Sequence, residues 1–176
     1  MPAGRRPAAV LVPIYDGPTG LMVLLFRRTP GGPHSGQIAF PGGRPELGDR
    51  DLQGTALREA HEELGIEPDS VRVIGELPVV ETNVSNFAIF PFVGRLTARP
   101  QIRPQASEVA AVLDVPLDLF WREPVEEWWD LAAVDARGQR RLLVRYFPWG
   151  EDKIWGATAR MIEHLVEAVK EGRIVL

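Results

Sequence analysis

Residues Gly43–Ile66 read GRPELGDRDLQGTALREAHEELGI, and this segment carries the most informative pattern in the chain. Strong helix formers run through Asp51–Leu64, and Gly65 follows at the place where a left-handed residue commonly ends a helix. The pattern therefore predicts a helix over Asp51–Leu64. Upstream, the short apolar run Gln37–Phe40 predicts a strand that Pro41–Gly43 ends.

Three carboxylates lie on one stripe of this predicted helix. Glu59, Glu62 and Glu63 have the spacing i, i+3, i+4, which the helical repeat brings to one side. Like charges at this spacing repel by about 0.2–0.5 kcal/mol per pair, so a purely structural helix gains nothing from them. A helix that binds Mg²⁺ does gain, because this ion takes oxygen ligands and shares them with substrate phosphates. The alternative is a solvated acidic face, and Arg58 beside it could pair with Glu62, with Asp49 or with another acid of the loop.

The rest of the chain indicates a mixed sheet and a second helix. Apolar runs bounded by turn residues predict strands at Ala8–Tyr15, Leu21–Arg28, Val71–Leu77, Ala88–Leu96, Val109–Val115 and Arg141–Phe147. Asp16–Gly20 predicts the turn of a hairpin between the first two strands, and Ile154–Glu171 is predicted as an amphipathic helix that Gly172 ends. The class is therefore α+β, or α/β with a mixed sheet.

Composition excludes several classes of protein. With 176 residues, 45% of them apolar and 25% charged, the chain is expected to form one folded domain over residues 1–176 rather than a disordered chain. Its net charge of −4 argues against a nucleic-acid partner. The absence of cysteine excludes disulfides and a cysteine nucleophile, and it fits a cytoplasmic protein. The longest apolar runs, Ala8–Tyr15 and Leu21–Phe26, are too short to span a membrane, so we expect no membrane partner.

The segment that begins at Gly43 resembles the Nudix box, which has a glycine, five residues, a glutamate, seven residues and then Arg-Glu-aliphatic-x-Glu-Glu-x-Gly-aliphatic. Gly43 and Asp49 have the five-residue gap, although Asp49 replaces the usual glutamate and eight residues separate it from Arg58. Arg58–Ile66 matches the second half at each fixed polar and glycine position, with Ala60 in the aliphatic slot. The resemblance implies a Nudix fold, an α/β/α sandwich with a mixed β-sheet between helices.

A second resemblance, over most of the chain, is to the coenzyme A pyrophosphatase branch of that family. LLFRRT at Leu24–Thr29 and HSGQIAFPGG at His34–Gly43 are similar to the signature that precedes the box in those enzymes. Phe26 stands where the signature usually has threonine, and Gly32 where it usually has an arginine suited to a phosphate. Another nucleoside diphosphate derivative, such as ADP-ribose, is therefore an alternative substrate. A non-catalytic Nudix module that binds a nucleotide is a further alternative. Later segments similar to that branch are Glu108–Val109, Val115–Leu117 and Ile154–Arg160.

The resemblance implies a hydrolase of coenzyme A or acyl-coenzyme A that yields adenosine 3′,5′-bisphosphate and (acyl-)4′-phosphopantetheine, with Mg²⁺ or Mn²⁺ as cofactor. Its partner would be a small CoA-like nucleotide, and a homodimer is expected by analogy with other Nudix proteins. The implied metal ligands are Glu59 and Glu63, with Glu62 in support. Glu108, at the start of a later strand, would bind metal or act as a base. The implied catalytic residues are Glu62, Glu63, Arg58 and Glu108, and the implied substrate-binding residues are Arg28, His34, Gly42, Gly43 and Arg44. For His34, a packing or capping role is the alternative.

Overall fold

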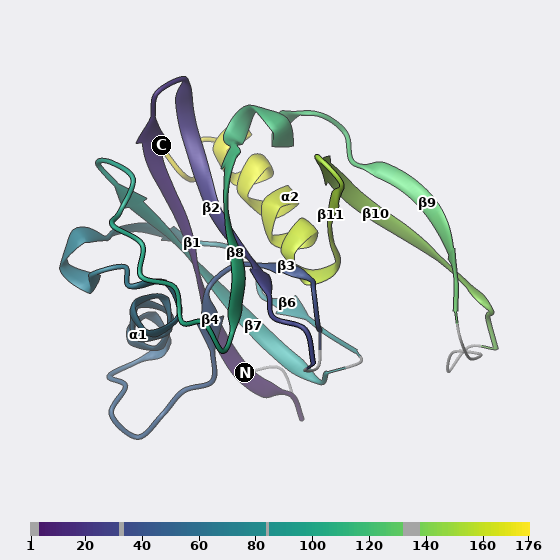
Figure 1. Ribbon diagram of the computed structural model, residues 1–176, viewed down its shortest axis with the longest axis horizontal. Coiled ribbons are helices and arrows are strands. Elements are labelled where there is room, and N and C mark those ends of the chain that lie inside the picture. Colours follow the sequence, from purple (N-terminus) through teal and green to yellow (C-terminus); the bar gives the residue numbers. More distant parts are fainter. Residues whose placement is uncertain (1–3, 32–33, 84, 132–137) are drawn as a thin grey trace.

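A mixed β-sheet lies between two helices, and a smaller three-stranded sheet projects beside it (Figure 1). This computed structural model describes residues 4–31, 34–83, 85–131 and 138–176. The helices are α1 (Leu52–Leu64) and α2 (Gly156–Lys170), and the 3₁₀ turns are η1 (Pro68–Ser70) and η2 (Leu117–Trp121). The strands are β1 (Arg6–Gly17), β2 (Gly20–Arg28), β3 (Ile38–Ala39), β4 (Gly42–Gly43), β5 (Arg72–Glu76), β6 (Val80–Glu81), β7 (Phe87–Leu96), β8 (Val109–Pro116), β9 (Val125–Asp130), β10 (Arg141–Trp149) and β11 (Asp152–Trp155).

Strand β1 is central, and its two long neighbours run in opposite directions. β2 returns antiparallel after a tight turn between Gly17 and Gly20, which confirms the predicted hairpin. β7 runs parallel to β1 along residues 6–15. The sheet order is β3-β2-β1-β7-β5, and β8 also pairs with β2. The predicted α+β class with a mixed sheet is therefore confirmed.

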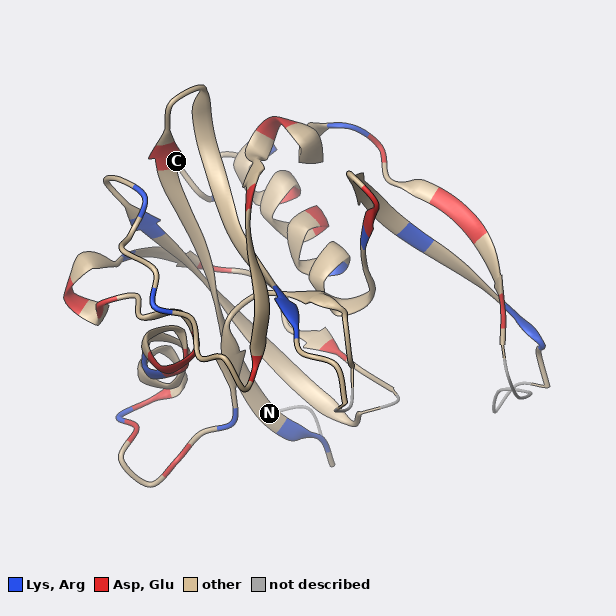
Figure 2. Cartoon of the chain, in the orientation of Figure 1, with Lys and Arg blue, Asp and Glu red and all other residues tan. Residues whose placement is uncertain are grey.

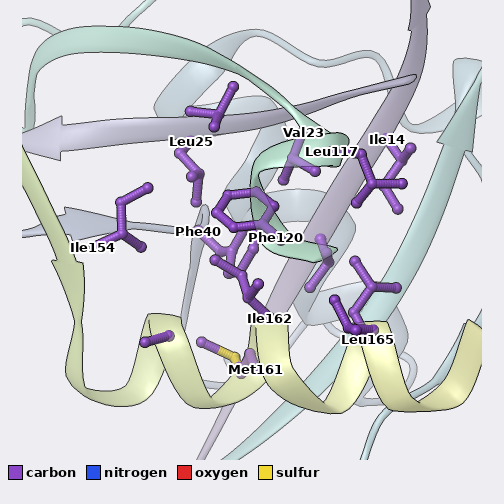
Figure 3. Close-up of a cluster of buried hydrophobic side chains, with 14 of the residues drawn as sticks. Ile14, Val23, Leu25, Phe40, Leu117, Phe120, Ile154, Met161, Ile162 and Leu165 are labelled. Carbon is purple, nitrogen blue, oxygen red and sulfur yellow. The ribbon is translucent and has the colours of Figure 1, made fainter. Parts of the chain in front are cut away.

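Both faces of β1 are buried, because the two helices cover opposite faces of the sheet. Leu11 packs on the α1 side, in a cluster with Ala60 and Leu64. Ile14 packs on the α2 side, in a cluster with Ile162, Leu165 and Phe120 (Figure 3). A strand covered on both faces needs apolar side chains at successive positions, which explains why the N-terminal run is continuous rather than alternating.

The second helix begins later than predicted. Ile154 and Trp155 were expected to be helical, but they belong to β11 and pair with Phe147 and Tyr146 of β10. Gly156 then takes a φ of +65°, a conformation that glycine adopts without a side-chain penalty, and the chain turns from strand to helix there. The expected helix start is wrong because the apolar spacing of this segment also suits a strand whose partner is distant in sequence.

Three further strands, β4, β6 and β9, are not indicated by the sequence pattern. Gly42–Gly43 was expected only to end a strand, but it forms β4 and pairs with β1 at Val10 and Ala9. β6 pairs with β7, and β9 pairs with β10 in the projecting sheet (Figure 1). In the described part of the chain, no helix is long and apolar enough to cross a membrane.

A buried phenol ties the end of β1 to β8. The Tyr15 hydroxyl donates to Asp114 at 2.6 Å, and Asp114 also accepts three hydrogen bonds from Arg99 at 2.9–3.1 Å. Burial, with the carboxylate beside it, raises the pKa of Tyr15 to about 12. We predict that Tyr15→Phe lowers the free energy of unfolding by about 1–2 kcal/mol, since one hydrogen bond to a charged acceptor is lost. Urea denaturation at neutral pH measures this, and an unchanged midpoint would contradict it.

Candidate active site

Helix α1 is fixed at both ends, which sets the direction of its acidic stripe. Asp51 caps the N-terminus by accepting from the Gly54 N–H at 2.8 Å. Gly65 has a φ of 72° and ends the helix as predicted. Ala60 and Leu64 are fully buried against the sheet. Because these positions face the core, the side chains of the acidic stripe lie at the edge of the sheet beside β4.

Glu63 is a buried carboxylate held by backbone. Its side chain is 3% exposed, and its Oε2 accepts from the Gly42 N–H at 2.9 Å. Burial raises the pKa of Glu63 to about 8, although the Gly42 hydrogen bond and the nearby Arg28 favour the charged form. A carboxyl group in this position is costly to ionise unless a cation joins it.

Glu59 lies directly over the backbone of Gly43. A Cβ atom added at Gly43 would stand 2.2 Å from Oε1 of Glu59, so a side chain there cannot coexist with this position of Glu59. Burial also raises the pKa of Glu59, and Arg58 opposes that shift. The close approach of Glu59 to the strand gives a physical reason for glycine at position 43.

Two further residues join this cluster. Arg28 comes from β2, and Glu108 is the residue before β8. The Arg28 guanidinium lies 4.0 Å from Oε1 of Glu63 and 3.8 Å from Oε2 of Glu108. The negative charge of Glu108 raises the pKa of both Glu59 and Glu63. Figure 2 shows acidic positions on α1 and at the start of β8 at the same end of the sheet. The structure therefore brings together two carboxylates of α1, the carboxylate of Glu108 and the guanidinium of Arg28.

Glu62 does not point into this cluster. Its side chain is half exposed, and its Oε2 accepts from Arg58 at 2.9 Å. Arg58 also binds both carboxylate oxygens of Asp49, at 2.9 and 3.1 Å, so the two partners weighed from the sequence are both used. A further contact joins Arg58 to Glu59 at 3.1 Å. Arg58 thus joins the loop before α1 to two acids of the helix, and the catalytic roles expected for Arg58 and Glu62 stay predictions.

The remaining predicted substrate-binding residues, His34 and Arg44, do not form one group in the structure. His34 is exposed and has a φ of 65°, and among the described residues its side chain has no hydrogen bond or ion pair. The packing role considered for it is therefore wrong. The Arg44 carbonyl accepts a hydrogen bond from Arg58 at 3.0 Å, while the Arg44 side chain lines a hollow beside Glu59. Gly32, the position of the missing arginine, lies outside the described residues.

The carboxylates fit a divalent metal ion by their chemistry. Glu59 and Glu63 are desolvated oxygen donors that approach each other from one helix, and a hard cation such as Mg²⁺ or Mn²⁺ offsets the charge that burial disfavours. Within the described ranges, no three His, Asp or Glu side chains are already placed to hold one ion together. Glu59 and Glu63 would hold the ion, and Glu108 lies near them beside Arg28.

Two open hollows mark this end and the opposite end of the sheet. The hollow beside Glu59 has a volume of about 460 Å³ and is lined by arginine, proline and glutamate side chains. The other, of about 420 Å³, lies between η2 and the C-terminal residues and has mainly apolar walls with Asp118 as its acid. The first hollow is the one adjacent to the carboxylate cluster, so it is the candidate for substrate binding.

Alanine substitutions at the two glycines of β4 should have different effects, one on turnover and the other on stability. Gly43→Ala pushes against the movable end of Glu59, so we expect turnover to fall about 100-fold with little loss of stability. Gly42→Ala places its Cβ 2.4 Å from the Ala9 carbonyl and 2.6 Å from the Val10 Cα, so we expect a loss of about 3 kcal/mol in stability. Steady-state rates and urea denaturation separate the two effects. Equal losses of stability in both variants would contradict the assignment.

Comparison with known proteins agrees with this geometry. Residues 4–137 match the NUDIX domain family. An uncharacterized Nudix hydrolase NudL of Pectobacterium atrosepticum is 37% identical over 168 residues, which cover 95% of this chain and 84% of that protein. A MutT/nudix family protein from Enterococcus faecalis has a similar fold, with a TM-score of 0.61 and 13% identity over 97% of this chain and 64% of its own. The NUDIX domain of Shewanella oneidensis NrtR, solved with ADP ribose, has a TM-score of 0.52 and 20% identity over 65% of this chain and 75% of its own.

The fold, the carboxylate helix and these matches together define a hydrolase that acts on pyrophosphate bonds. The chain belongs to the NUDIX domain family.

Proposed function

We propose that this Nudix hydrolase cleaves coenzyme A or acyl-coenzyme A to adenosine 3′,5′-bisphosphate and (acyl-)4′-phosphopantetheine. The observation that carries the proposal is the convergence of Glu59, Glu63, Glu108 and Arg28 beside the backbone of Gly42–Gly43. The choice of substrate is supported by the sequence signature upstream of the box, because that signature supplies both Arg28 and the glycine pair.

Each residue of the cluster has a task in such a reaction. A Mg²⁺ or Mn²⁺ ion held by Glu59 and Glu63 would offset charge on the phosphate oxygens and lower the pKa of a water molecule. Arg28 faces the same space with several donors for phosphate oxygens. Glu108, which is only partly buried, accepts the proton of the attacking water. The water oxygen bonds to one phosphorus, and the bridging oxygen leaves with the other phosphate, so no covalent enzyme intermediate is needed.

Product analysis with purified protein tests the substrate. Coenzyme A, ADP-ribose and a dinucleoside polyphosphate are incubated in parallel with Mg²⁺ or Mn²⁺, and again with a chelator, and the products are identified by mass spectrometry. We expect adenosine 3′,5′-bisphosphate and 4′-phosphopantetheine from coenzyme A, only when metal is present. Rapid cleavage of ADP-ribose or the dinucleotide with coenzyme A intact would reject this substrate.

Metal binding tests whether the protein is an enzyme of this class at all. Isothermal titration should detect uptake of Mg²⁺ or Mn²⁺ by the wild-type protein, with or without nucleotide, because Glu59 and Glu63 are both retained. Lack of uptake under both conditions would instead support a non-catalytic nucleotide-binding module.

We also propose that residues 1–176 form one domain. Helix α2 lies beyond the matched residues 4–137, yet it buries Ile162 and Leu165 against the same sheet that carries the site. The homodimeric state and the cytoplasmic location stay predictions from the sequence.

A further inference from the structure

The hollow beside Glu59 lies between the start of β1 and the loop that follows β4. Ala9 of β1 pairs with Gly43 of β4, so the two chain segments leave this ladder side by side and form opposite walls. Its volume of about 460 Å³ is within the range of small-ligand sites, which is roughly 300–1,000 Å³. The lining residues are Arg6, Pro7, Arg44, Pro45, Glu46 and Glu59.

Arg6 is held at one wall with donors to spare. Its Nη2 donates to the Ser85 carbonyl at 2.8 Å, and its guanidinium carbon lies 4.4 Å from the centre of the Phe87 ring. No other hydrogen bond or ion pair of this guanidinium occurs in the described part of the chain. The ring and the carbonyl therefore orient the group while leaving Nε and Nη1 available to a ligand.

Arg44 stands on the opposite wall. Its side chain has no hydrogen bond or ion pair with any described residue, whereas its carbonyl is fixed by Arg58. Two guanidinium groups with unused donors at one hollow suit an anion that accepts several hydrogen bonds. Glu46 and Glu59 line the same hollow and oppose an anion, although the Glu59 carboxylate is paired with Arg58 at 3.1 Å.

We infer that this hollow binds a second phosphate group of the substrate, separate from the pyrophosphate, and that Arg6 and Arg44 determine specificity for it. The inference rests on the proposed function, because the metal ion that Glu59 would help to hold is expected to bind the pyrophosphate beside this hollow. In a CoA-like nucleotide the second phosphate is the one on the ribose 3′-oxygen. Arg6 and Arg44 thus provide a phosphate contact at a place other than position 32, where the signature usually has its arginine.

The test compares two nucleotides that differ only in this phosphate, adenosine 3′,5′-bisphosphate and AMP. Isothermal titration with Mg²⁺ present is carried out on the wild type, Arg6→Gln and Arg44→Gln. We expect each variant to weaken binding of the bisphosphate about tenfold, the loss of one charge-assisted contact, and to leave AMP binding within about twofold. Glu46→Gln should have the opposite effect and tighten bisphosphate binding by about threefold, because a like charge is removed.

Arg5→Gln is the matched control. Arg5 adjoins Arg6 in sequence, but its guanidinium is occupied by Glu81, the Thr82 carbonyl and Asn83, and it does not line the hollow. Binding of both nucleotides should be unchanged in this variant. Circular dichroism and urea midpoints confirm that all four variants remain folded.

A kinetic comparison keeps this inference distinct from the proposed function. With coenzyme A and dephospho-coenzyme A as substrates, Arg6→Gln should lower the kcat/KM ratio between the two by about tenfold. If the protein bound the bisphosphate more tightly than AMP but did not cleave coenzyme A, the proposed substrate would be rejected and the phosphate site in the hollow would be supported. The inferred phosphate site would be wrong, whatever the substrate, if the wild type bound the bisphosphate and AMP equally. It would also be wrong if Arg5→Gln had the same effect as Arg6→Gln.

Discussion

Glu63→Gln should lower turnover by at least about 1,000-fold, which corresponds to about 4 kcal/mol of transition-state stabilisation, while the protein remains folded. Glutamine keeps an oxygen that accepts the Gly42 N–H, so the link between α1 and β4 is preserved. What it removes is the negative charge at the most buried position of the cluster. Steady-state kinetics with saturating Mg²⁺ measure the loss, and titration of Mg²⁺ should show weaker binding in the same variant.

The same substitution should stabilise the metal-free protein in alkaline solution. Because the pKa of Glu63 rises from 4.5 to about 8 on folding, the folded state binds more protons than the unfolded state between these values. The contribution of Glu63 to wild-type stability therefore falls by about 1.4 kcal/mol per pH unit between these two pKa values, and this contribution is constant at higher pH. Glu63→Gln lacks this slope. Urea denaturation in the presence of a chelator, across this pH range, measures the difference.

Glu67→Gln is the control for both measurements, because Glu67 is well exposed just after α1 and pairs with His61 at 3.6 Å. It removes one negative charge from the same region without touching the cluster. Wild-type turnover in Glu63→Gln would show that this carboxylate is not a metal ligand. If the stability of Glu63→Gln changed with pH in parallel with that of the wild type, the Glu63 carboxyl would have an ordinary pKa in the folded protein.

The local features of α1 could be predicted from the sequence because they depend on neighbours along the chain. Asp51 and Gly65 mark the ends of the helix by cap chemistry, and the spacing of Glu59 and Glu63 follows from the helical repeat. The side of the helix on which the acids gather is fixed by the buried Ala60 and Leu64. None of these inferences needs knowledge of a distant contact.

Features that depend on contacts between distant parts of the chain could not be predicted from local residue patterns. Gly42–Gly43 has no side chains to show periodicity, and it becomes a strand only because Val10 and Ala9 lie beside it. Glu62 has the same helical spacing as its neighbours, but Arg58 draws it away from the cluster. The place of Glu108 beside Glu63 follows from the pairing of β8 with β2, which the sequence alone does not reveal.

Arg58→Met should cost about 3–5 kcal/mol of stability, since it leaves the carboxylate of Asp49, only 6% exposed, without its ionic partner. The loop between β4 and α1 is held by this pair and by the bond from Arg58 to the Arg44 carbonyl. Glu59 loses its 3.1 Å contact at the same time, so turnover should fall about 100-fold in the protein that stays folded. Arg50→Met, at an exposed position beside Asp49 in sequence, is the matched control and should change neither quantity.

Stability measured at acidic pH separates the loss of the Arg58–Asp49 ion pair from a general loss of packing. Arg58 holds the pKa of Asp49 well below its ordinary value of 3.8, so the unfolded state takes up a proton before the folded state does. The stabilisation from the pair is therefore complete above about pH 4 and declines as the pH falls below it. The gap in unfolding free energy between wild type and Arg58→Met should narrow over the same acid range. Parallel curves would mean that the loss does not come from the ion pair with Asp49, and that the loop carrying Arg44 and Glu46 is positioned by something other than this pair.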